Sequence, residues 1–371
     1  MAHARAWNES AGEGVGECMS NETYNSAYVN PNEVVKPEDI HFGLDTFGDD
    51  IFGDQEKSLL NVARQAKLAD EVGVYSFNLG EHHRPDFTIS APLTTLGYIA
   101  GITKNIHLGT AVVVLSSDDP VRVYEQMATV HTLSGGRAEL TVGRGSFIES
   151  FPLFGYQLSE YEPLFEEKLE MLVKIWNERP FTWDGTLTQQ LERQELFPKI
   201  DTSTLPVFVA VGGSPESVIR TARYDLGLRL AIIGGATERF APFADLYRRA
   251  QAEFGHTERR SLGFHSPGLI ADTDEEAIAA FQRDYVESNA RIGAERGWPA
   301  MTDARFKQEI EYGSLFVGSP ERVATKIANG IRALGADTFD LKIGQGDPDA
   351  QLKSIELYAT KVAPMVRDML S

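Results

Sequence analysis

From residue 40 onward, short apolar runs alternate with longer amphipathic segments. Residues 111–115 are five consecutive apolar residues, a pattern typical of parallel strands buried on both faces. Phe165, Leu169, Leu172 and Trp176 fall instead at helical spacing, on one apolar stripe. The pattern predicts eight strands, at residues 42–47, 74–79, 106–115, 138–143, 207–211, 228–233, 262–270 and 339–343.

Helix starts can be located between these strands. A capping residue followed by proline occurs at Asp119-Pro120, Ser214-Pro215, Ser319-Pro320 and Asp347-Pro348. Eight strands separated by helices favour a (β/α)8 TIM barrel. The alternative is an open, doubly wound sheet, but no G-x-G-x-x-G motif follows the first strand.

The domain organisation follows from the same pattern. Residues 1–38 are polar and small with little periodicity, so we expect a flexible N-terminal extension. Residues 39–371 then form one barrel. Residues 180–205 and 292–317 exceed an ordinary connection, and we expect both to be insertions at the carboxyl-end face of the barrel.

Composition narrows the functional class. The 371 residues are 42% hydrophobic and 10% aromatic, which excludes a disordered chain. The net charge of −19 argues against nucleic acid and anionic membranes as partners. The single cysteine, Cys18, excludes an intrachain disulfide and a multi-cysteine metal site. We see no targeting signal and no bilayer-spanning run, so we expect a cytoplasmic protein.

In such a barrel, the chemistry takes place where strands end. The second predicted strand ends at Glu81, His82 and His83. Histidine suits general acid–base catalysis near neutral pH, although these side chains could also simply cap the strand. Adjacent residues of an extended strand point to opposite faces, and the H-E-x-x-H spacing is absent, so we expect no metal site.

The third strand ends at Thr110, Ala111 and Val112, whose modest size lets a flat ligand approach the backbone. From these residues alone, ordinary tight packing is the favoured explanation.

The next two strands end in residues suited to a phosphate group. Arg144 lies between two glycines, and its guanidinium matches phosphate geometry. Gly212, Gly213 and Ser214 precede a helix start, where free backbone N–H groups favour an anion. The alternatives are a salt bridge for Arg144 and a helix cap for Ser214.

Four further residues are candidates for a substrate pocket. Phe47 and Phe147 suggest apolar walls of the pocket. His83 is a candidate because it is the second histidine at the end of the second predicted strand. His265, within the seventh strand, belongs either to the pocket or to the core. An apolar pocket suggests a small organic substrate such as an aldehyde.

Together these residues resemble the bacterial luciferase-like, flavin-dependent monooxygenase family, from about residue 41 to residue 367. The resemblance rests on the order and spacing of six motifs rather than on any one of them. They are Glu81-His82-His83, Gly109-Thr110-Ala111, Asp119-Pro120-Val121-Arg122, Leu133-Ser134-Gly135-Gly136-Arg137, Gly143-Arg144-Gly145 and Val317-Gly318-Ser319-Pro320-Glu321.

The resemblance implies a dimeric TIM barrel that binds reduced FMN or a deazaflavin at the carboxyl ends of its strands. His82 matches a histidine that acts near the flavin, and Arg144 matches an arginine on the flavin phosphate. The bond between Ala111 and Val112 matches a non-proline cis peptide beneath the flavin ring.

The resemblance also implies a two-component monooxygenase, in which a separate flavin reductase supplies reduced FMN for the oxidation of a small-molecule substrate. The alternatives are a dehydrogenase dependent on the deazaflavin coenzyme F420 and a flavin-binding barrel without catalysis. Gly213 and Ser214 align with a phosphate-binding glutamate–serine pair, and glycine here replaces the glutamate.

Overall fold

Eight parallel strands close into a ring in the computed structural model, which describes residues 35–145, 147–297 and 299–371. In ring order they are β1 (His41–Thr46), β2 (Ser76–Leu79), β3 (His107–Thr110), β5 (Ala138–Gly143), β8 (Val207–Val211), β9 (Gly227–Ala231), β10 (Leu262–Ile270) and β12 (Thr338–Lys342). β12 pairs with β1, so the ring has no open edge. The fold is therefore the expected TIM barrel. Most of the expected extension, residues 1–34, lies outside the described residues.

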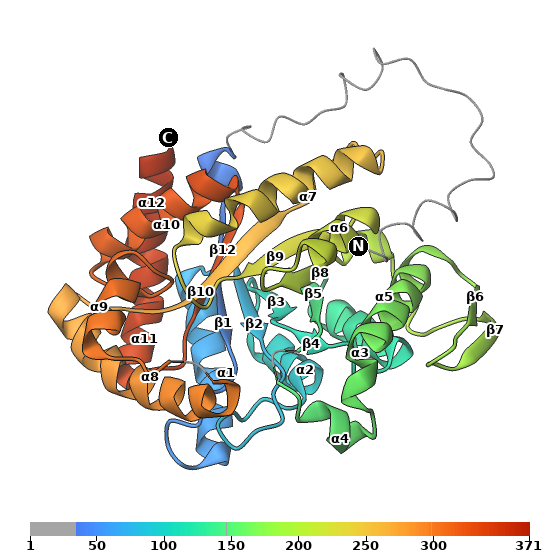
Figure 1. Ribbon diagram of the computed structural model, residues 1–371, viewed down its shortest axis with the longest axis horizontal. Coiled ribbons are helices and arrows are strands. Elements are labelled where there is room, and N and C mark those ends of the chain that lie inside the picture. The colour runs from blue at the N-terminus through green and yellow to red at the C-terminus, as the bar shows by residue number, and fades with distance from the viewer. Residues whose placement is uncertain (1–34, 146, 298) are drawn as a thin grey trace.

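Helices surround the ring of strands (Figure 1). They are α1 (Gln55–Val72), α2 (Pro92–Ile102), α3 (Pro120–Leu133), α5 (Tyr161–Asn177), α6 (Pro215–Arg223), α7 (Ala241–Glu253), α10 (Pro320–Leu334), α11 (Pro348–Leu357) and α12 (Ala363–Leu370). The four predicted starts are confirmed, because Asp119, Ser214, Ser319 and Asp347 each accept a backbone N–H bond from the first turn that follows. Short 3-10 helices cover Pro37–Asp39, Leu158–Glu160, Thr202–Thr204 and Thr237–Phe240, and a π-helix covers Tyr358–Val362.

The predicted strand at 106–115 is wrong in one respect, because the structure interrupts it. β3 ends at Thr110, and a two-residue strand, β4 (Val113–Val114), resumes the pairing with β5. Gly109 pairs with Glu139 and Val113 pairs with Val142. The three residues between Gly109 and Val113 therefore lie opposite only two residues of β5. This extra residue is a bulge, and bulges are frequent beside active sites.

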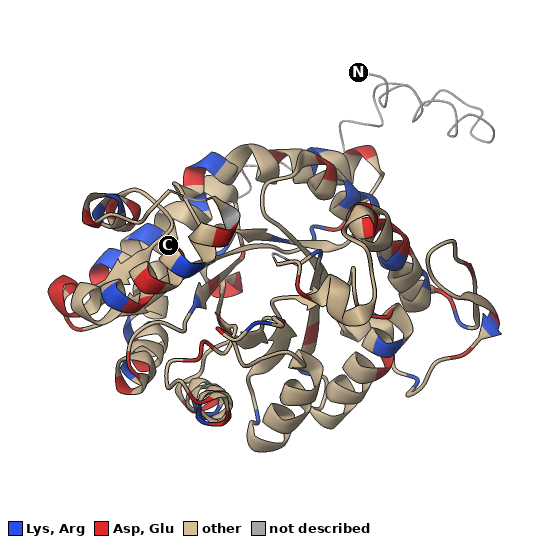
Figure 2. Ribbon diagram, turned by 60° about the horizontal axis from the view of Figure 1, so that its bottom comes forward, with Lys and Arg blue, Asp and Glu red and all other residues tan. Residues whose placement is uncertain are grey.

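The two faces of the strands differ in a way that the apolar runs did not predict. Outward residues such as Leu44, Phe77 and Leu341 are fully buried and pack against the helices. Many inward positions are instead small or polar, and they include charged residues that line the cavity. Figure 2 marks the charged residues along the ribbon of the strands. The main apolar core therefore lies between strands and helices, and the barrel interior is left for polar chemistry.

The two expected insertions have structure of their own. Residues 180–205 contain an antiparallel hairpin, β6 (Phe181–Asp184) and β7 (Gln190–Gln194), which projects away from the barrel (Figure 1). The second stretch begins inside α8 (Asp274–Arg296) and continues through α9 (Asp303–Glu311) to β11 (Phe316–Gly318), which pairs with β10. A short helix, α4 (Ser150–Phe154), follows β5. Within the described ranges, the helices are too short or too polar to cross a bilayer.

Candidate active site

A cavity of about 430 Å³ lies at the carboxyl ends of the strands and reaches into the barrel. This volume is within the range of small-molecule sites. The residues predicted for the site that line it are Phe47, His82, Thr110, Ala111, Val112, Arg144, Phe147, Gly212 and His265. Of the other described candidates, His83, Gly213 and Ser214 are not part of the lining.

His82 is enclosed by three phenylalanine rings. Its ring centroid lies 4.5 Å from that of Phe47, 4.7 Å from that of Phe87 and 5.1 Å from that of Phe147. Its backbone N–H donates to the carbonyl of Ile89 over 2.9 Å, which fixes the strand end. The imidazole is 8% exposed, so it faces the cavity in a largely apolar setting that excludes water.

Glu81 joins two strand ends and orients His83. One carboxylate oxygen accepts a bond from the backbone N–H of Val114 over 2.8 Å, and the other lies 2.9 Å from Nε2 of His83. His83 turns away from the cavity and packs its ring edge-on against Phe154. The two histidines thus point in different directions, as the strand geometry predicted.

The backbone after β3 forms a flat wall of the cavity. The peptide bond between Ala111 and Val112 is cis, which confirms the expectation. Ala111 donates its N–H to the carbonyl of Leu79 over 2.7 Å, and the Val112 carbonyl accepts from Glu81 over 3.2 Å. Thr110 donates its hydroxyl to the carbonyl of Thr141 over 2.7 Å.

Arg144 forms a salt bridge with Glu162 of α5, which was the alternative reading of this residue. Arg220 of α6 lies on the other side of the same carboxylate, 3.9 Å away, and pairs with Glu166 over 2.5 Å. Sequence reasoning missed Arg220, whose position six residues after Ser214 is informative only once α6 is known.

The start of α6 is compatible with both interpretations of its sequence, the helix cap and the anion site. Ser214 caps the helix by accepting a bond from the N–H of Ser217 over 3.2 Å. Gly213 has a φ of +120°, which favours glycine. The pKa of the exposed Glu216 is lowered by its own N–H and by the Ser214 hydroxyl, and also by Arg220 and Arg144. The field of both arginines therefore reaches this helix start.

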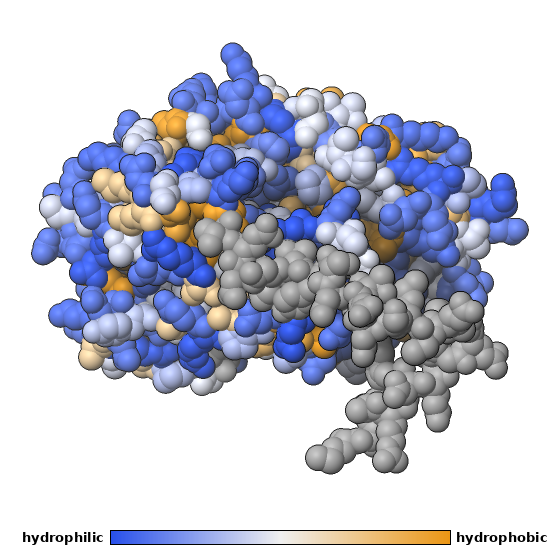
Figure 3. Space-filling view, turned by 90° about the horizontal axis from the view of Figure 1, so that it is seen from above, coloured by the Kyte–Doolittle hydropathy of each residue, from blue (hydrophilic) through white to orange (hydrophobic). Residues whose placement is uncertain are grey.

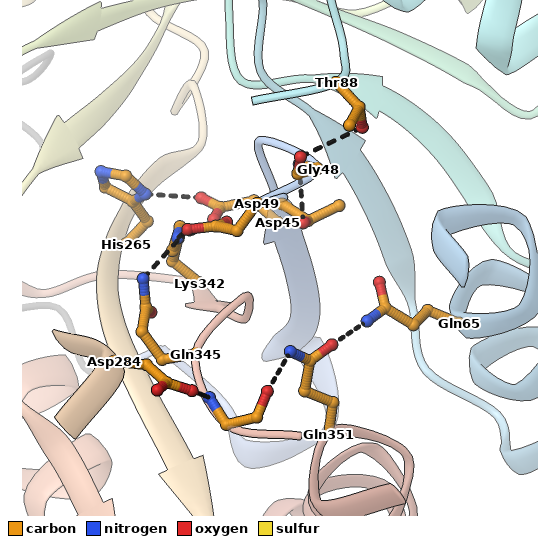
Figure 4. Close-up of polar contacts among 12 residues, drawn as sticks. Asp45, Gly48, Asp49, Gln65, Thr88, His265, Asp284, Lys342, Gln345 and Gln351 are labelled. Carbon is orange, nitrogen blue, oxygen red and sulfur yellow. Dashed lines mark hydrogen bonds and ion pairs between the residues drawn. The ribbon is translucent and has the colours of Figure 1, made fainter. Parts of the chain in front are cut away.

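The cavity floor contains a buried carboxylate–imidazole pair. Nδ1 of His265 lies 2.5 Å from Oδ2 of Asp45 (Figure 4). Burial lowers the pKa of His265, but the Asp45 carboxylate outweighs it, so the pKa is raised above its ordinary value. Burial also raises the pKa of the neighbouring Asp340 to about 7, against the attraction of Arg229.

A second ion pair lies beside this floor. Nζ of Lys342 donates to Asp49 over 2.8 Å, and Nε2 of Gln345 donates to the same carboxylate over 3.0 Å (Figure 4). Lys342 also lies over the ring of Phe47, 4.9 Å from its centroid. A carboxylate from the segment after β1 thus pairs with a lysine of β12 beside the cavity.

Comparison with known proteins places the chain in a family. The sequence model of the luciferase-like monooxygenases matches residues 42–338. The chain belongs to the luciferase-like monooxygenase family. This luciferase-like chain is 30% identical over 334 residues to the uncharacterised protein y4wF of Sinorhizobium fredii, covering 84% of this chain and 93% of that protein. It is 23% identical over 330 residues to the alkanal monooxygenase alpha chain of Photobacterium leiognathi, covering 82% and 92%.

Solved structures share the fold of this luciferase-like protein. Monooxygenase RslO1 of Streptomyces bottropensis superposes with a TM-score of 0.77 at 21% identity, over 88% of this chain and 99% of that one. The oxygenating constituent of 3,6-diketocamphane monooxygenase of Pseudomonas putida, in complex with FMN, gives 0.72 at 21%, over 88% and 98%. The coenzyme F420 dependent tetrahydromethanopterin reductase of Methanopyrus kandleri gives 0.67 at 17%, over 88% and 99%.

Arg84 is a further residue of the luciferase-like site that sequence reasoning missed. Its guanidinium lies over the ring of Phe147, 4.6 Å from the centroid, and donates to Asp86 over 3.0 Å and to Glu295 of α8 over 2.8 Å. This contact holds α8, whose Tyr285 also lines the cavity, over the cavity mouth. The sequence signal was the Arg84 position directly after the histidines, but its partner is 211 residues away.

Among the described residues, no group of three or more His, Cys, Asp or Glu side chains is arranged to hold a metal ion.

Proposed function

We propose that the protein is a two-component monooxygenase that uses reduced FMN and O2 to oxidise a small organic substrate. A separate flavin reductase supplies the reduced FMN in this proposal. The observation that carries it is the arrangement of one cavity, in which the aromatic enclosure of His82 adjoins the flat wall at Ala111 and Val112 and Arg144 lies at the edge. Family membership supports an oxidoreductase activity of this kind.

The residues of the cavity suit reduced FMN, which would supply the electrons for O2 activation when it is bound. In this proposal the planar ring system lies against the wall at Thr110, Ala111 and Val112. The phosphate lies at the start of α6, near Arg144 and Arg220, where Gly212 leaves open space for it. Glu162 would have to release Arg144, because a carboxylate and a phosphate compete for the same guanidinium.

His82 is proposed as the group that moves a proton during turnover. Its imidazole can accept or donate a proton near neutral pH, and it faces the cavity beside the wall on which the flavin ring would lie. The rings of Phe47, Phe87 and Phe147 exclude water from this point. Phe47, Phe147 and His265 are proposed as substrate contacts, and His83 as a residue held in place by Glu81.

Binding of FMN to the isolated protein tests the cofactor assignment. We expect oxidised and reduced FMN to raise the melting temperature, by an amount that grows with the logarithm of the ligand concentration once this exceeds the dissociation constant. The matched control is riboflavin, which has the same ring system without the phosphate. A larger shift with FMN than with riboflavin supports a phosphate site, and no shift with any flavin contradicts the proposal.

A dehydrogenase that uses coenzyme F420 is the second candidate, because the reductase with the shared fold depends on that coenzyme. The net charge of −19 disfavours the long acidic tail of such a coenzyme. A larger thermal shift with F420 than with FMN would favour this candidate. Failure of both to bind would leave a barrel without flavin chemistry.

We further propose a homodimer that forms through α2. The helix has no charged residue, and its outer side exposes Thr94, Tyr98 and Gly101, with Tyr98 59% exposed. Leu133 at the end of the neighbouring α3 is 69% exposed. The face seen in Figure 3, above α6 and α7, is in contrast mostly hydrophilic. Apolar patches of this kind mark interaction sites.

The net charge also bears on the localisation and on the partners of the protein. A net charge of −19 fits a cytoplasmic protein with neither a nucleic-acid nor a membrane partner, which is what we propose.

A further inference from the structure

One wall of the cavity carries two oxygen atoms that have no hydrogen-bond partner. They are Oδ1 of Asp45 and Oε1 of Gln345. Both side chains line the cavity, and they are only 1% and 7% exposed. Buried polar atoms in proteins are nearly always paired with protein, water or ligand, so two unpaired atoms on one cavity wall are positions where the donors of a ligand can bind.

The neighbouring contacts fix the chemical character of these two atoms. Nε2 of Gln345 donates to Asp49 over 3.0 Å, which leaves the amide oxygen as the unpaired atom. Asp45 uses its other oxygen for Nδ1 of His265, over 2.5 Å. An ionised carboxylate and an amide oxygen can only accept hydrogen bonds. A ligand must therefore supply the hydrogen-bond donors for these two oxygens.

The carboxylates beside the two unpaired oxygens each have a cationic partner. Asp45 lies against His265, and Asp49 lies against Lys342 at 2.8 Å. Each carboxylate therefore already has a cationic partner when His265 is protonated. A charged ligand group would lose its hydration without a countercharge, and this loss is costly in a buried site. These pairings favour an uncharged ligand group.

The two sides of the cavity differ in polarity. The rings of Phe47, Phe87 and Phe147 surround His82 on one side, and Asp45 and Gln345 lie on the side of β1 and β12. A ligand that matches both sides has an apolar body and one uncharged group with N–H or O–H donors. This is a narrower class than the plain aldehyde that the phenylalanines alone suggested.

We propose that Asp45 and Gln345 form a substrate subsite for an uncharged hydrogen-bond-donating group, with a primary carboxamide as its simplest form. The inference rests on the proposed function, because it assigns the flat wall at Ala111 and Val112 to the flavin and the wall with Asp45 and Gln345 to the substrate. His265 lies on the same wall, and its Nε2 is available to contact the carbonyl of the amide. The flavin ring itself also carries an N–H between carbonyl groups, so the experiment must distinguish the two sources.

Two matched probes test the proposal on the full chain without flavin. Hexanamide offers two N–H donors, and N,N-dimethylhexanamide offers none on an equally long apolar chain. We expect hexanamide to bind about tenfold more tightly, measured by ligand-observed NMR titration. Gln345→Met keeps the side-chain length but removes the acceptor, and we expect it to abolish most of this preference.

The controls separate the alternatives. Gln126→Met, on the outer side of α3, should leave the preference unchanged. Gln345→Leu replaces Gln345→Met if the latter fails to fold, as judged by circular dichroism. Equal affinity of the wild type for both amides, or a full preference in the folded Gln345 variant, would overturn the proposal.

A third result assigns the wall to the cofactor. If Gln345→Met weakens FMN binding and leaves the amide preference intact, the wall binds the flavin and the substrate proposal is wrong. Because the amide titrations contain no flavin, a failure of the monooxygenase proposal is seen separately, as a lack of FMN binding to the wild type.

Discussion

His265 and Asp45 pair across the full width of one strand. Nδ1 of His265, on β10, lies 2.5 Å from Oδ2 of Asp45, on β1, and β12 runs between these two strands. The contact is possible because inward positions of this barrel are small or polar, so side chains can meet inside it. The pair gives the cavity a polar floor beneath its aromatic upper part.

Asp45→Asn should lower the pKa of His265. The carboxylate raises this pKa against the effect of burial, so burial dominates in the variant and the pKa falls below 6.5. Titration of the imidazole signal by NMR measures the change, with Asp272→Asn on the surface as the control. An unchanged pKa would mean that Asp45 does not determine the protonation of His265.

The same variant should lose stability mainly in acid. A histidine with a raised pKa contributes stability below its unfolded pKa, and this contribution is lost as the pH rises through the folded pKa. The gap in melting temperature between wild type and Asp45→Asn should therefore be larger at pH 5.5 than at pH 8.5. A gap that grows toward alkaline pH would contradict this account.

Asp340→Asn should stabilise the protein at alkaline pH. Burial raises the pKa of Asp340 to about 7, against Arg229, while Asp45 and Glu139 add to the rise. Stability linked to Asp340 is present below pH 4 and is lost as the pH rises to about 7, by at most about 4 kcal/mol. Urea unfolding at pH 5 and pH 8 measures this. A benefit larger at pH 5 than at pH 8 would refute the assignment.

Arg144→Ala should weaken FMN binding by about 10- to 100-fold, the value of one or two charge-assisted hydrogen bonds. Riboflavin has no phosphate, so its affinity should change little. Glu162→Gln removes the competing carboxylate and should strengthen FMN binding, most clearly at low salt. Isothermal titration calorimetry measures the affinities for FMN and riboflavin in each variant. An equal loss of affinity for both flavins in Arg144→Ala would mean that the phosphate binds elsewhere.

Tyr98→Glu should convert a dimer into a monomer, because it introduces a charge into the uncharged outer side of α2. Light scattering coupled to gel filtration measures the mass. Tyr312→Glu is the matched control, since Tyr312 is 71% exposed next to α9, remote in sequence from α2. A wild-type monomer, or a dimer that survives Tyr98→Glu, would contradict the proposed interface.

Sequence periodicity predicted the barrel well, because each strand buries an outward apolar face that leaves a clear signal. The bounds of β5, β8 and β10 agree with the prediction at both ends. The strand break at Ala111 and Val112 was not visible in the apolar run. The bulge depends on pairing with β5, and an apolar run contains no information on that register.

The residues of the candidate site could be predicted from the individual strands that carry them, but the contacts between these residues could not. His82 and Arg144 were found because each lies within three residues of the end of a predicted strand, and Ala111 because it belongs to a predicted strand with small residues; all three line the cavity. A salt bridge of Arg144 was expected as an alternative, but its partner Glu162 could not be named from the sequence. The pairing of Asp45 with His265 was missed, because these partners are 220 residues apart and meet only in the closed barrel. One sequence signal for the polar inward face was present in β12, where the charged residues Asp340 and Lys342 alternate with the buried, apolar Leu341.

His82→Ala should separate catalysis from cofactor binding. Loss of a general acid–base group lowers turnover by about 100-fold or more, whereas the flavin affinity should stay within about threefold. Product formation with a substrate of the wild type measures the first quantity, and titration with FMN measures the second. Equal losses in both would give His82 a binding role only.

The central claim is that the cavity binds reduced FMN and controls its reaction with O2. The most direct measurement mixes the protein with reduced FMN without oxygen and then adds O2 in a stopped-flow spectrophotometer. We expect the bound flavin to follow a different time course from free reduced FMN, and a substrate to change that time course. Reoxidation at the rate of free reduced FMN, with and without the protein, would contradict the claim.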